Sequence, residues 1–326
     1  MATFTYSEDH IKKLREFLGD KERNEKLRKI LKDFPDSNSI SQLDKTKIKE
    51  LHIKVIEKLL HDIYLRYRQG LIKWAEITKQ TAIVDPEYLS MHLVSVFTGI
   101  PGIGTAARGF DLADGSEVKS SSRVEQLGKC RECGAAVMSF EEKCGNCGSE
   151  NIERKFDSHW IFSLRDEQEV GKLLSRPMIY LVLFDYEDVN KRDVVRIRIW
   201  KLNPKDKLVQ VFFRDYYFEE FFRKRVDKGE RPAPCNLHPD KPLTKSLKPM
   251  LVFLGKIDFT TFRISIEFIN SEGTPERIKE SDVRGLLSKR RLFYKKVSQL
   301  GLENDYKQRL EEITESSSKL SNFLRN

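Results

Sequence analysis

Three side chains that could hydrolyse a phosphodiester lie within residues 108–122. Asp111 precedes an Asp-Gly pair, and Glu117 and Lys119 follow it, separated by one apolar residue. Asp-Gly is favoured in two-residue hairpin turns because both residues tolerate positive φ. On the strand expected after the turn, Glu117 and Lys119 would point to one face while the residue between them enters the core. Asp111 would then lie opposite them, across a hairpin.

Carboxylates beside a lysine suit a hard divalent cation that holds a phosphate and a water molecule. An Asp, a short gap and Glu-x-Lys resemble the core of the PD-(D/E)xK nuclease superfamily, and the surrounding residues are similar to those of type II restriction endonucleases. The resemblance implies that Asp111 and Glu117 bind Mg2+, together with the Val118 carbonyl. It also implies that Lys119 orients or deprotonates the attacking water.

The stretch departs from the superfamily pattern at one position and leaves one alternative open. Phe110 stands where the superfamily often has a proline, and Asp114 competes with Asp111 for the role of first aspartate. The alternative interpretation of the stretch is a surface hairpin with a solvated acidic turn. We favour the catalytic interpretation because the turn residues, the strand alternation and the flanking serines agree.

Neighbouring residues are candidates for DNA contacts and for a further carboxylate. We expect Arg108, Ser120 and Ser121 to contact DNA. Asp85 and the Pro-Glu that follows it predict a helix start, with a capping aspartate and an acid at the positive end of the helix dipole. Since such a helix precedes the metal site in nucleases of this superfamily, Glu87 is a further catalytic candidate. Stabilisation of the helix dipole is the simpler account of Glu87.

A second motif, made of four cysteines, predicts a structural metal site. Cys130 and Cys133 form one C-x-x-C pair, and Cys144 and Cys147 form another. Two such pairs complete a closed tetrahedral Zn2+ site. A disulfide pair is the less favoured alternative because we expect no secretory signal. The expected zinc ribbon, residues 128–152, either stabilises a short insertion or contacts DNA through basic side chains, and the sequence does not decide between these roles.

Composition and apolar runs indicate the class of partner. The chain has 59 Lys and Arg against 50 Asp and Glu, a formal net charge of +9. Such a surplus favours association with nucleic acid. The longest apolar run, residues 178–184, is too short to cross a bilayer, and the first residues lack the apolar core of a signal peptide. We therefore expect a soluble intracellular protein with no membrane partner, and the resemblance to restriction endonucleases implies the cytoplasm of a prokaryotic cell.

Hydrophobic periodicity predicts three regions. Residues 1–80 form a helical amino-terminal region, residues 81–275 a nuclease core with the inserted zinc ribbon, and residues 276–326 a helical carboxyl-terminal region. Within the core, residues 178–186 are expected to form a strand buried on both faces, and residues 209–214 a further strand. The predicted fold class is mixed α/β, a central mixed sheet flanked by helices, as in restriction endonucleases.

These patterns support three hypotheses about function. The first is a Mg2+-dependent type II restriction endonuclease that cleaves double-stranded DNA; family membership would imply 5′-phosphate products, and a palindromic site would imply a homodimer. The second is a structure-specific nuclease of DNA repair or recombination. The third is a zinc-ribbon nucleic-acid-binding protein without catalysis, in which the Asp111 stretch is incidental.

Overall fold

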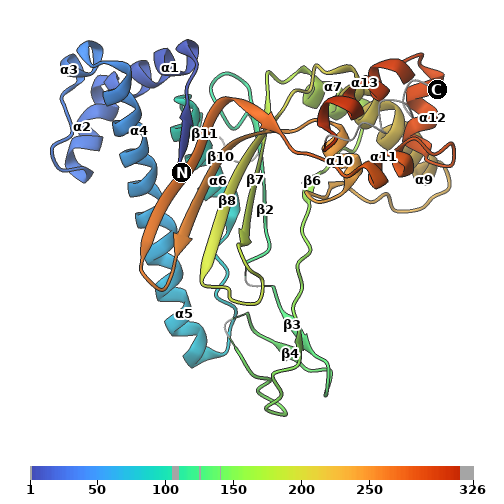
Figure 1. Ribbon diagram of the computed structural model, residues 1–326, viewed down its shortest axis with the longest axis horizontal. Helices are drawn as coiled ribbons and strands as arrows, with labels where there is room; N and C mark the ends of the chain where they lie inside the picture. Colours follow the sequence, from blue (N-terminus) through green and yellow to red (C-terminus); the bar gives the residue numbers. More distant parts are fainter. Residues whose placement is uncertain (1, 105–109, 125, 140, 316–326) are drawn as a thin grey trace.

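The computed structural model describes residues 2–104, 110–124, 126–139 and 141–315. A six-stranded mixed sheet lies at its centre, in the order β1-β11-β10-β8-β7-β2 (Figure 1). In that order the strands are Thr3–Thr5, Arg263–Pro275, Met250–Asp258, Val194–Leu202, Ile179–Tyr186 and Glu117–Ser122. β1 is parallel to β11 and β2 is parallel to β7, whereas the other neighbours are antiparallel. The predicted mixed α/β class is therefore confirmed.

The amino-terminal helices lie on one side of this sheet, where the later ones cover its face and the first three pack in a core of their own. They are α1 Glu8–Gly19, α2 Lys21–Ile30, α3 Ser37–Gln42, α4 Lys45–Leu60, the π-helical turn η1 His61–Leu65, α5 Arg66–Thr78 and α6 Pro86–Thr98. Figure 1 shows α4, η1 and α5 following one another as a long rod beside the sheet. Apolar side chains of α4, η1 and α6, among them Ile56, Tyr64 and Leu93, pack into one core with the sheet.

The opposite face carries the later helices and a small second sheet. The helices are α7 Glu167–Ser175, α8 Lys207–Gln210, the π-helix η2 Val211–Arg223, α9 Lys224–Asp227, α10 Pro242–Ser246, α11 Glu280–Leu286, α12 Leu292–Gln299 and α13 Glu303–Ile313. The small sheet pairs β6 Trp160–Phe162 with β9 Cys235–Leu237. The boundaries predicted at residues 80 and 275 remain a prediction.

β7 shows why the sheet needs both layers. Leu181 and Leu183 pack into the core shared with α7, η2 and the carboxyl-terminal helices. Val182 and Phe184 pack into the core shared with α4 and α6. Successive side chains of a strand point to opposite faces, so a nearly continuous apolar run is stable only between two covering layers. The prediction of a strand buried on both faces is confirmed.

The strand predicted at residues 209–214 is wrong, because these residues lie in α8 and η2. Asp206 caps this helix: its carboxylate accepts hydrogen bonds from the backbone N–H groups of Leu208 and Val209, at 2.9 and 3.3 Å. Phe212 and Phe213 are both buried in the core. A short apolar run fits a buried helix as well as a buried strand, and here the cap decides between them.

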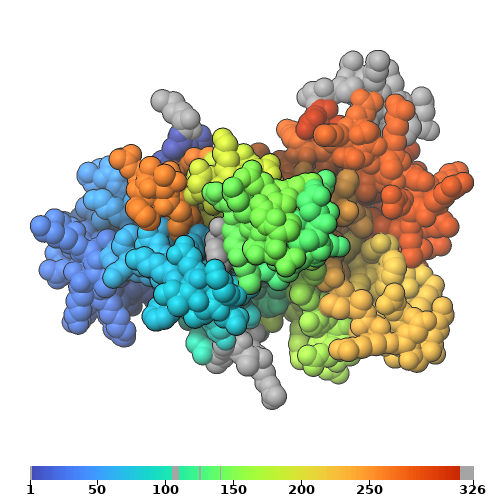
Figure 2. Space-filling model, turned by 90° about the horizontal axis from the view of Figure 1, so that it is seen from below, coloured from blue at the N-terminus to red at the C-terminus, as the bar shows by residue number. Residues whose placement is uncertain are grey.

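The predicted ribbon is a separate three-stranded unit, in the order β4-β3-β5. Its strands are Gly128–Cys130 (β3), Ala136–Val137 (β4) and Ile152–Glu153 (β5). Seen from below, it stands forward between the amino-terminal and carboxyl-terminal parts of the molecule (Figure 2, green). Among the described helices, none is long and apolar enough to span a membrane.

A buried carboxylate ties β2 to its neighbours. Asp185 of β7 is fully buried, at 0% exposure. Its Oδ2 accepts hydrogen bonds from Nη2 of Arg196, at 2.9 Å, and from Nη2 of Arg198, at 2.6 Å. Nη1 of Arg123, the residue after β2, lies 4.0 Å from the same oxygen. One carboxylate therefore balances guanidinium groups from the ends of β2 and from β8.

We predict that Asp185→Ala lowers the free energy of unfolding by about 3–5 kcal/mol, because it leaves guanidinium groups buried without their carboxylate. The matched control is Glu187→Ala. Glu187 forms an ion pair at the surface with Lys256, at 2.6 Å, and its loss should cost less than about 1 kcal/mol. Urea unfolding measures both values. Equal losses in the two variants would contradict the role given to Asp185.

Candidate active site

Glu117 and Lys119 lie side by side at the start of β2. Nζ of Lys119 is 2.8 Å from Oε1 of Glu117. Val118, between them, is buried at 8% exposure. This is the alternation predicted for the strand, and it arises because β2 is paired on its inner side with β7, Glu117 lying opposite Ile179. An ammonium group and a carboxylate thus leave the same face of an edge strand.

Asp111 reaches this pair from a tight turn, so the predicted hairpin is wrong. β2 pairs in parallel with β7, and Leu112, on the other side of the turn, forms an isolated antiparallel bridge with Gly102. The long buried strand β7 offers β2 a better partner than the short segment before the turn. Oδ2 of Asp111 accepts a hydrogen bond of 2.7 Å from the backbone N–H of Val118. That bond brings the carboxylate to the start of β2.

Asp114, the alternative first aspartate, stabilises the turn. Its carboxylate accepts hydrogen bonds from the backbone N–H of Ser116, at 2.9 Å, and from the Ser116 hydroxyl, at 3.0 Å. Gly115 has a φ of 90°, which a residue with a side chain rarely adopts. The Asp-Gly pair therefore forms a turn as predicted, and the geometry favours Asp111 as the carboxylate next to Glu117.

Arg176, which the sequence did not single out, completes the cluster. Its Nη2 lies 3.3 Å from Oε2 of Glu117, and its guanidinium stacks over the Phe110 ring, 4.2 Å from the ring centre. Arg176 follows α7 shortly before β7 begins. It approaches Glu117 only because β2 and β7 are parallel and in register at their starts. The sequence alone gives no signal for this pairing.

The charges of the cluster favour a bound cation. Burial raises the pKa of Asp111, and the neighbouring Glu117 carboxylate raises it further, against the opposing effects of the Val118 N–H, Lys119 and Arg176. A half-buried carboxylate beside another carboxylate carries a cost when both are ionised. Carboxylate oxygens are the ligands that Mg2+ takes in proteins. The donor set therefore fits a hard divalent cation.

Glu87 lies away from this cluster. It is an exposed residue in the first turn of α6, where Asp85 accepts a hydrogen bond of 2.9 Å from its backbone N–H. The carboxyl end of α6 is the end nearer the cluster. The chain that follows it is joined to the turn after Asp111, because the Pro101 carbonyl accepts a hydrogen bond from the N–H of Ala113. Glu87 and Thr98 are therefore separated by about 16 Å of helix at 1.5 Å per residue. Helix-dipole stabilisation accounts for Glu87 in this position.

The residues expected to contact DNA differ in their positions. Arg108 lies outside the described residues. Ser120 is half-buried and follows Lys119 on β2, with its side chain on the opposite face of the strand. Ser121 is buried at 8% exposure and lies on the same face of β2 as Glu117 and Lys119.

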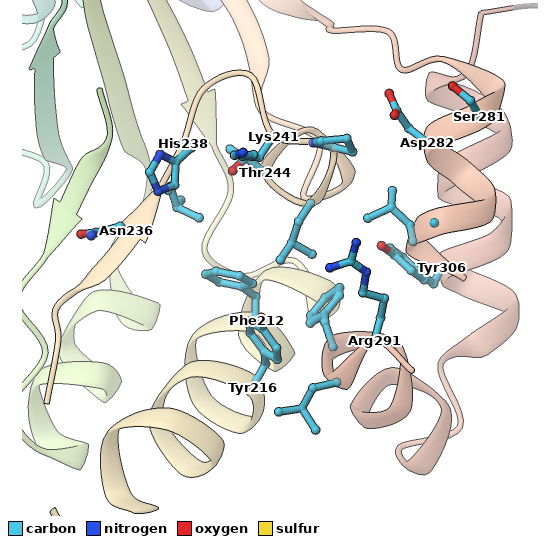
Figure 3. A pocket seen from close by; sticks show the side chains of 17 residues that line it. Phe212, Tyr216, Asn236, His238, Lys241, Thr244, Ser281, Asp282, Arg291 and Tyr306 are labelled. Carbon is cyan, nitrogen blue, oxygen red and sulfur yellow. The ribbon is translucent and has the colours of Figure 1, made fainter. Parts of the chain in front are cut away.

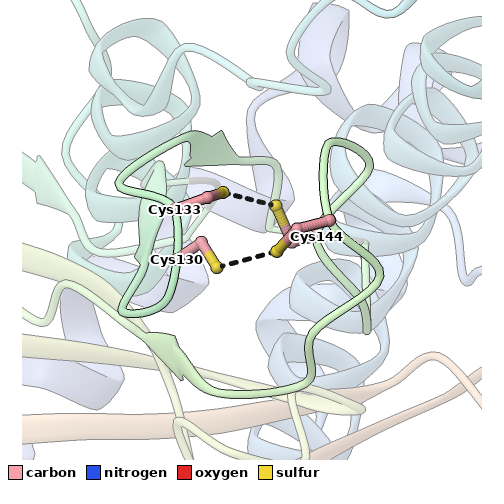
Figure 4. A group of neighbouring side chains, drawn as sticks. Cys130, Cys133 and Cys144 are labelled. Atoms are coloured by element: carbon pink, nitrogen blue, oxygen red, sulfur yellow. Dashed lines mark hydrogen bonds between the residues drawn. The ribbon is translucent and has the colours of Figure 1, made fainter.

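The four ribbon cysteines form a compact cluster (Figure 4). Sγ of Cys130 lies 3.6 Å from Sγ of Cys147, and Sγ of Cys133 lies 3.5 Å from Sγ of Cys144. All four are free thiols within 4.8 Å of one another, so the disulfide alternative is not formed. Sulfur atoms bound to one Zn2+ at about 2.3 Å would lie about 3.8 Å apart. The spacing therefore fits a tetrahedral metal ion.

Comparisons with known proteins indicate the family of this chain. Residues 73–282, which include β2 and the ribbon, match a family model described as MamI restriction endonuclease. The type II restriction enzyme MamI of Microbacterium ammoniaphilum is 28% identical over 212 residues, which are 65% of this chain and 61% of that enzyme. The chain thus spans about three fifths of the length of this relative. No solved structure matches the chain significantly.

We predict that Asp111→Asn raises the melting temperature at pH 7 in Mg2+-free buffer, by about 2 °C. The raised pKa of Asp111 means that the folded state favours the protonated acid, so stability is lost as the pH rises from the ordinary value of 3.8 through the raised value. Asn keeps an acceptor for the Val118 N–H and cannot ionise. The gain should shrink as the pH falls toward 3.8.

The control for this measurement is Asp258→Asn. The pKa of Asp258 is lowered, first by the hydrogen bond from the Thr261 backbone. Its ionised form therefore stabilises the fold, and the substitution should lower the melting temperature at pH 7. A decrease in both variants would contradict the description of Asp111.

Proposed function

Because the chain belongs to the MamI restriction endonuclease family, we propose that it is a Mg2+-dependent type II endodeoxyribonuclease that hydrolyses phosphodiester bonds at specific sites in double-stranded DNA. The observation that carries the proposal is the cluster of Asp111, Glu117 and Lys119 at the start of β2. The net charge of +9 suits a polyanionic substrate.

Asp111 and Glu117 would hold Mg2+, with the Val118 carbonyl as a further oxygen ligand. Mg2+ bound there would supply a Lewis acid that lowers the pKa of a bound water and offsets negative charge on the phosphate. The support for this assignment is chemical: burial, and then the charge of Glu117, raise the pKa of the half-buried Asp111, and a bound cation would favour its ionised form.

The remaining side chains would position the reacting groups. Lys119, 2.8 Å from Glu117, would orient the attacking water or take up its proton. Arg176 would hold the second oxygen of Glu117, while its contact with Phe110 fixes the guanidinium plane. Glu117 is thus constrained at both oxygens, so its orientation does not depend on one flexible contact. Breaking the bond to the 3′ oxygen would leave a 5′-phosphate.

We further propose that the protein acts as a homodimer in the cytoplasm of a prokaryotic cell. A palindromic DNA site has two-fold symmetry, and one protomer provides one cluster for one strand. Two copies related by the same symmetry would cut both strands.

We predict that the purified protein cuts mixed-sequence plasmid DNA into discrete fragments with Mg2+ and does not cut in Mg2+-free buffer. Glu117→Gln should lower the cleavage rate at least about 100-fold because it weakens a metal-holding group. The matched control is Glu267→Gln, since Glu267 forms an ion pair with Lys256, at 3.0 Å, on β11, remote from β2 in the strand order. Sequencing the fragment ends identifies the recognition site.

Two other results would favour the alternative functions. Preferential cleavage of branched DNA in competition with linear duplex would indicate a structure-specific repair or recombination nuclease. Binding without cleavage, whatever the divalent metal, would indicate a zinc-ribbon DNA-binding protein and would overturn the catalytic proposal.

We propose that the ribbon binds structural Zn2+ through Cys130, Cys133, Cys144 and Cys147. Cys144→Ser should reduce the zinc bound per chain by one equivalent and make the ribbon susceptible to proteolysis, because a small metal-held unit folds on its ion. The control is Cys235→Ser. Cys235 is buried in the main core, where burial raises the pKa of its thiol. Elemental analysis gives the zinc content, and equal content in both variants would contradict the assignment.

A further inference from the structure

A second group of potential metal ligands lies where the chain returns from the ribbon to the core. His159 directly precedes β6 and His238 directly follows β9. β6 and β9 are antiparallel, with Trp160 opposite Leu237. The two histidines are therefore the next facing pair beyond the ends of these strands, and their ring centres are 5.1 Å apart. Fixed strand register, and not chance proximity of loops, brings the imidazoles together.

Asp157 supplies a carboxylate to the same place. Its Oδ1 lies 3.7 Å from Nδ1 of His238, and one ligand atom from each of the three residues lies within 4.8 Å of the others. Ligand atoms around a tetrahedral ion with bonds of about 2.1 Å would lie about 3.4 Å apart. The Asp157 side chain is 79% exposed and free to rotate inward. Its backbone is held, since its N–H donates to Oε1 of Gln126 at 3.1 Å.

The imidazoles suit metal binding. Nδ1 of His159 is buried and has no hydrogen-bond partner among the described residues. An imidazole nitrogen that carries no proton can donate its lone pair to a metal ion, and the His159 ring, with its unpartnered Nδ1, lies beside the His238 ring.

We propose that Asp157, His159 and His238 bind a divalent transition-metal ion, at a site distinct from both the four-cysteine cluster of the ribbon and the Asp111 cluster. Imidazole nitrogens with one carboxylate suit Zn2+ and its neighbours in the first transition row, whereas Mg2+ takes oxygen ligands. Three protein ligands leave a position for water.

Binding of the ion would connect two segments of the chain. His238 lines one side of a cavity of about 570 Å³ between the β9–α10 segment and the carboxyl-terminal helices, where Asn236 and Lys241 also lie (Figure 3). The ion would link residues 157–159, on the stretch of chain that leaves the ribbon, to the β9–α10 segment. Arg123 reinforces the same junction, since its Nε donates to the Ser158 hydroxyl at 2.9 Å and it forms an ion pair with Asp240. The ion would therefore fix the base of the ribbon against β2 and the carboxyl-terminal region.

The test is the number of Zn2+ ions bound per full-length chain, measured by equilibrium dialysis at micromolar free Zn2+ with Mg2+ in large excess, so that Mg2+ and not Zn2+ occupies the Asp111 cluster. Wild type should bind two equivalents, one in each zinc site. His238→Ala should bind one and keep the thiolate-to-metal absorption of the Co2+-substituted ribbon. Cys144→Ser should also bind one but lose that absorption. The control His92→Ala, which removes an exposed histidine of α6, should bind two.

The results separate this site from the ribbon site. A wild-type stoichiometry of one that only Cys144→Ser abolishes would overturn the proposal and leave the ribbon assignment intact. If His238→Ala lost the ribbon absorption through misfolding, Asp157→Asn decides, because it changes an exposed side chain. If Asp157→Asn binds one of the two Zn2+ equivalents at least about tenfold more weakly than wild type, the result supports the site. If it binds both equivalents as tightly as wild type, the result overturns the proposal.

Discussion

The parallel pairing of β2 with β7 is the constraint on which the rest of the site depends. It sets Glu117 opposite Ile179, and so brings Arg176, which lies just before β7, to the carboxylate of Glu117. It also commits the backbone of β2 to one buried partner, so that the turn before it does not form a hairpin strand. Asp111 then reaches the cluster through one hydrogen bond to the Val118 N–H. The order of the strands, more than any local motif, assembles the candidate site.

Local patterns predicted local features well. Glu117 and Lys119 share a face because strand alternation needs only a buried neighbour at Val118. The cysteine pairs form their cluster because Gly134 and Gly148, with φ of 75° and 72°, allow the turn after each pair. Features that depend on partners distant in sequence were not predictable. The hairpin at Asp111 and the approach of Arg176 to Glu117 required knowledge of which segment packs beside which, whereas the helix over residues 209–214 is marked locally by its Asp206 cap.

The carboxylates of Asp111 and Glu117 destabilise the fold when both are ionised, and the same carboxylates suit a divalent cation. Burial and the Glu117 charge both raise the pKa of Asp111, so the ionised pair opposes folding when no cation is present. Lys119 and Arg176 each contact one oxygen of Glu117 and reduce this cost. Neither Lys119 nor Arg176 adds a carboxylate to the cluster. Asp114 uses its carboxylate within the preceding turn, where it accepts a hydrogen bond from the Ser116 N–H. The two basic groups thus reduce, without removing, the cost of two ionised carboxylates, and a bound divalent ion would offset the remainder.

The two ends of β2 connect this chemistry to the ribbon. The carboxylates lie at its start, whereas Arg123, just past its end, hydrogen-bonds to Ser158 on the limb returning from the ribbon. Asp185 and Asp240 hold the same guanidinium from two other segments. The six-residue strand β2 therefore carries Glu117 and Lys119 near its start and leads directly into the Arg123 junction at its end. β2 is an edge strand paired on one side only, with β7, and the contacts of Arg123 with Ser158 and Asp240 add a second hold at its end. The strand that carries Glu117 is therefore joined at its other end to the stretch of chain that leaves the ribbon.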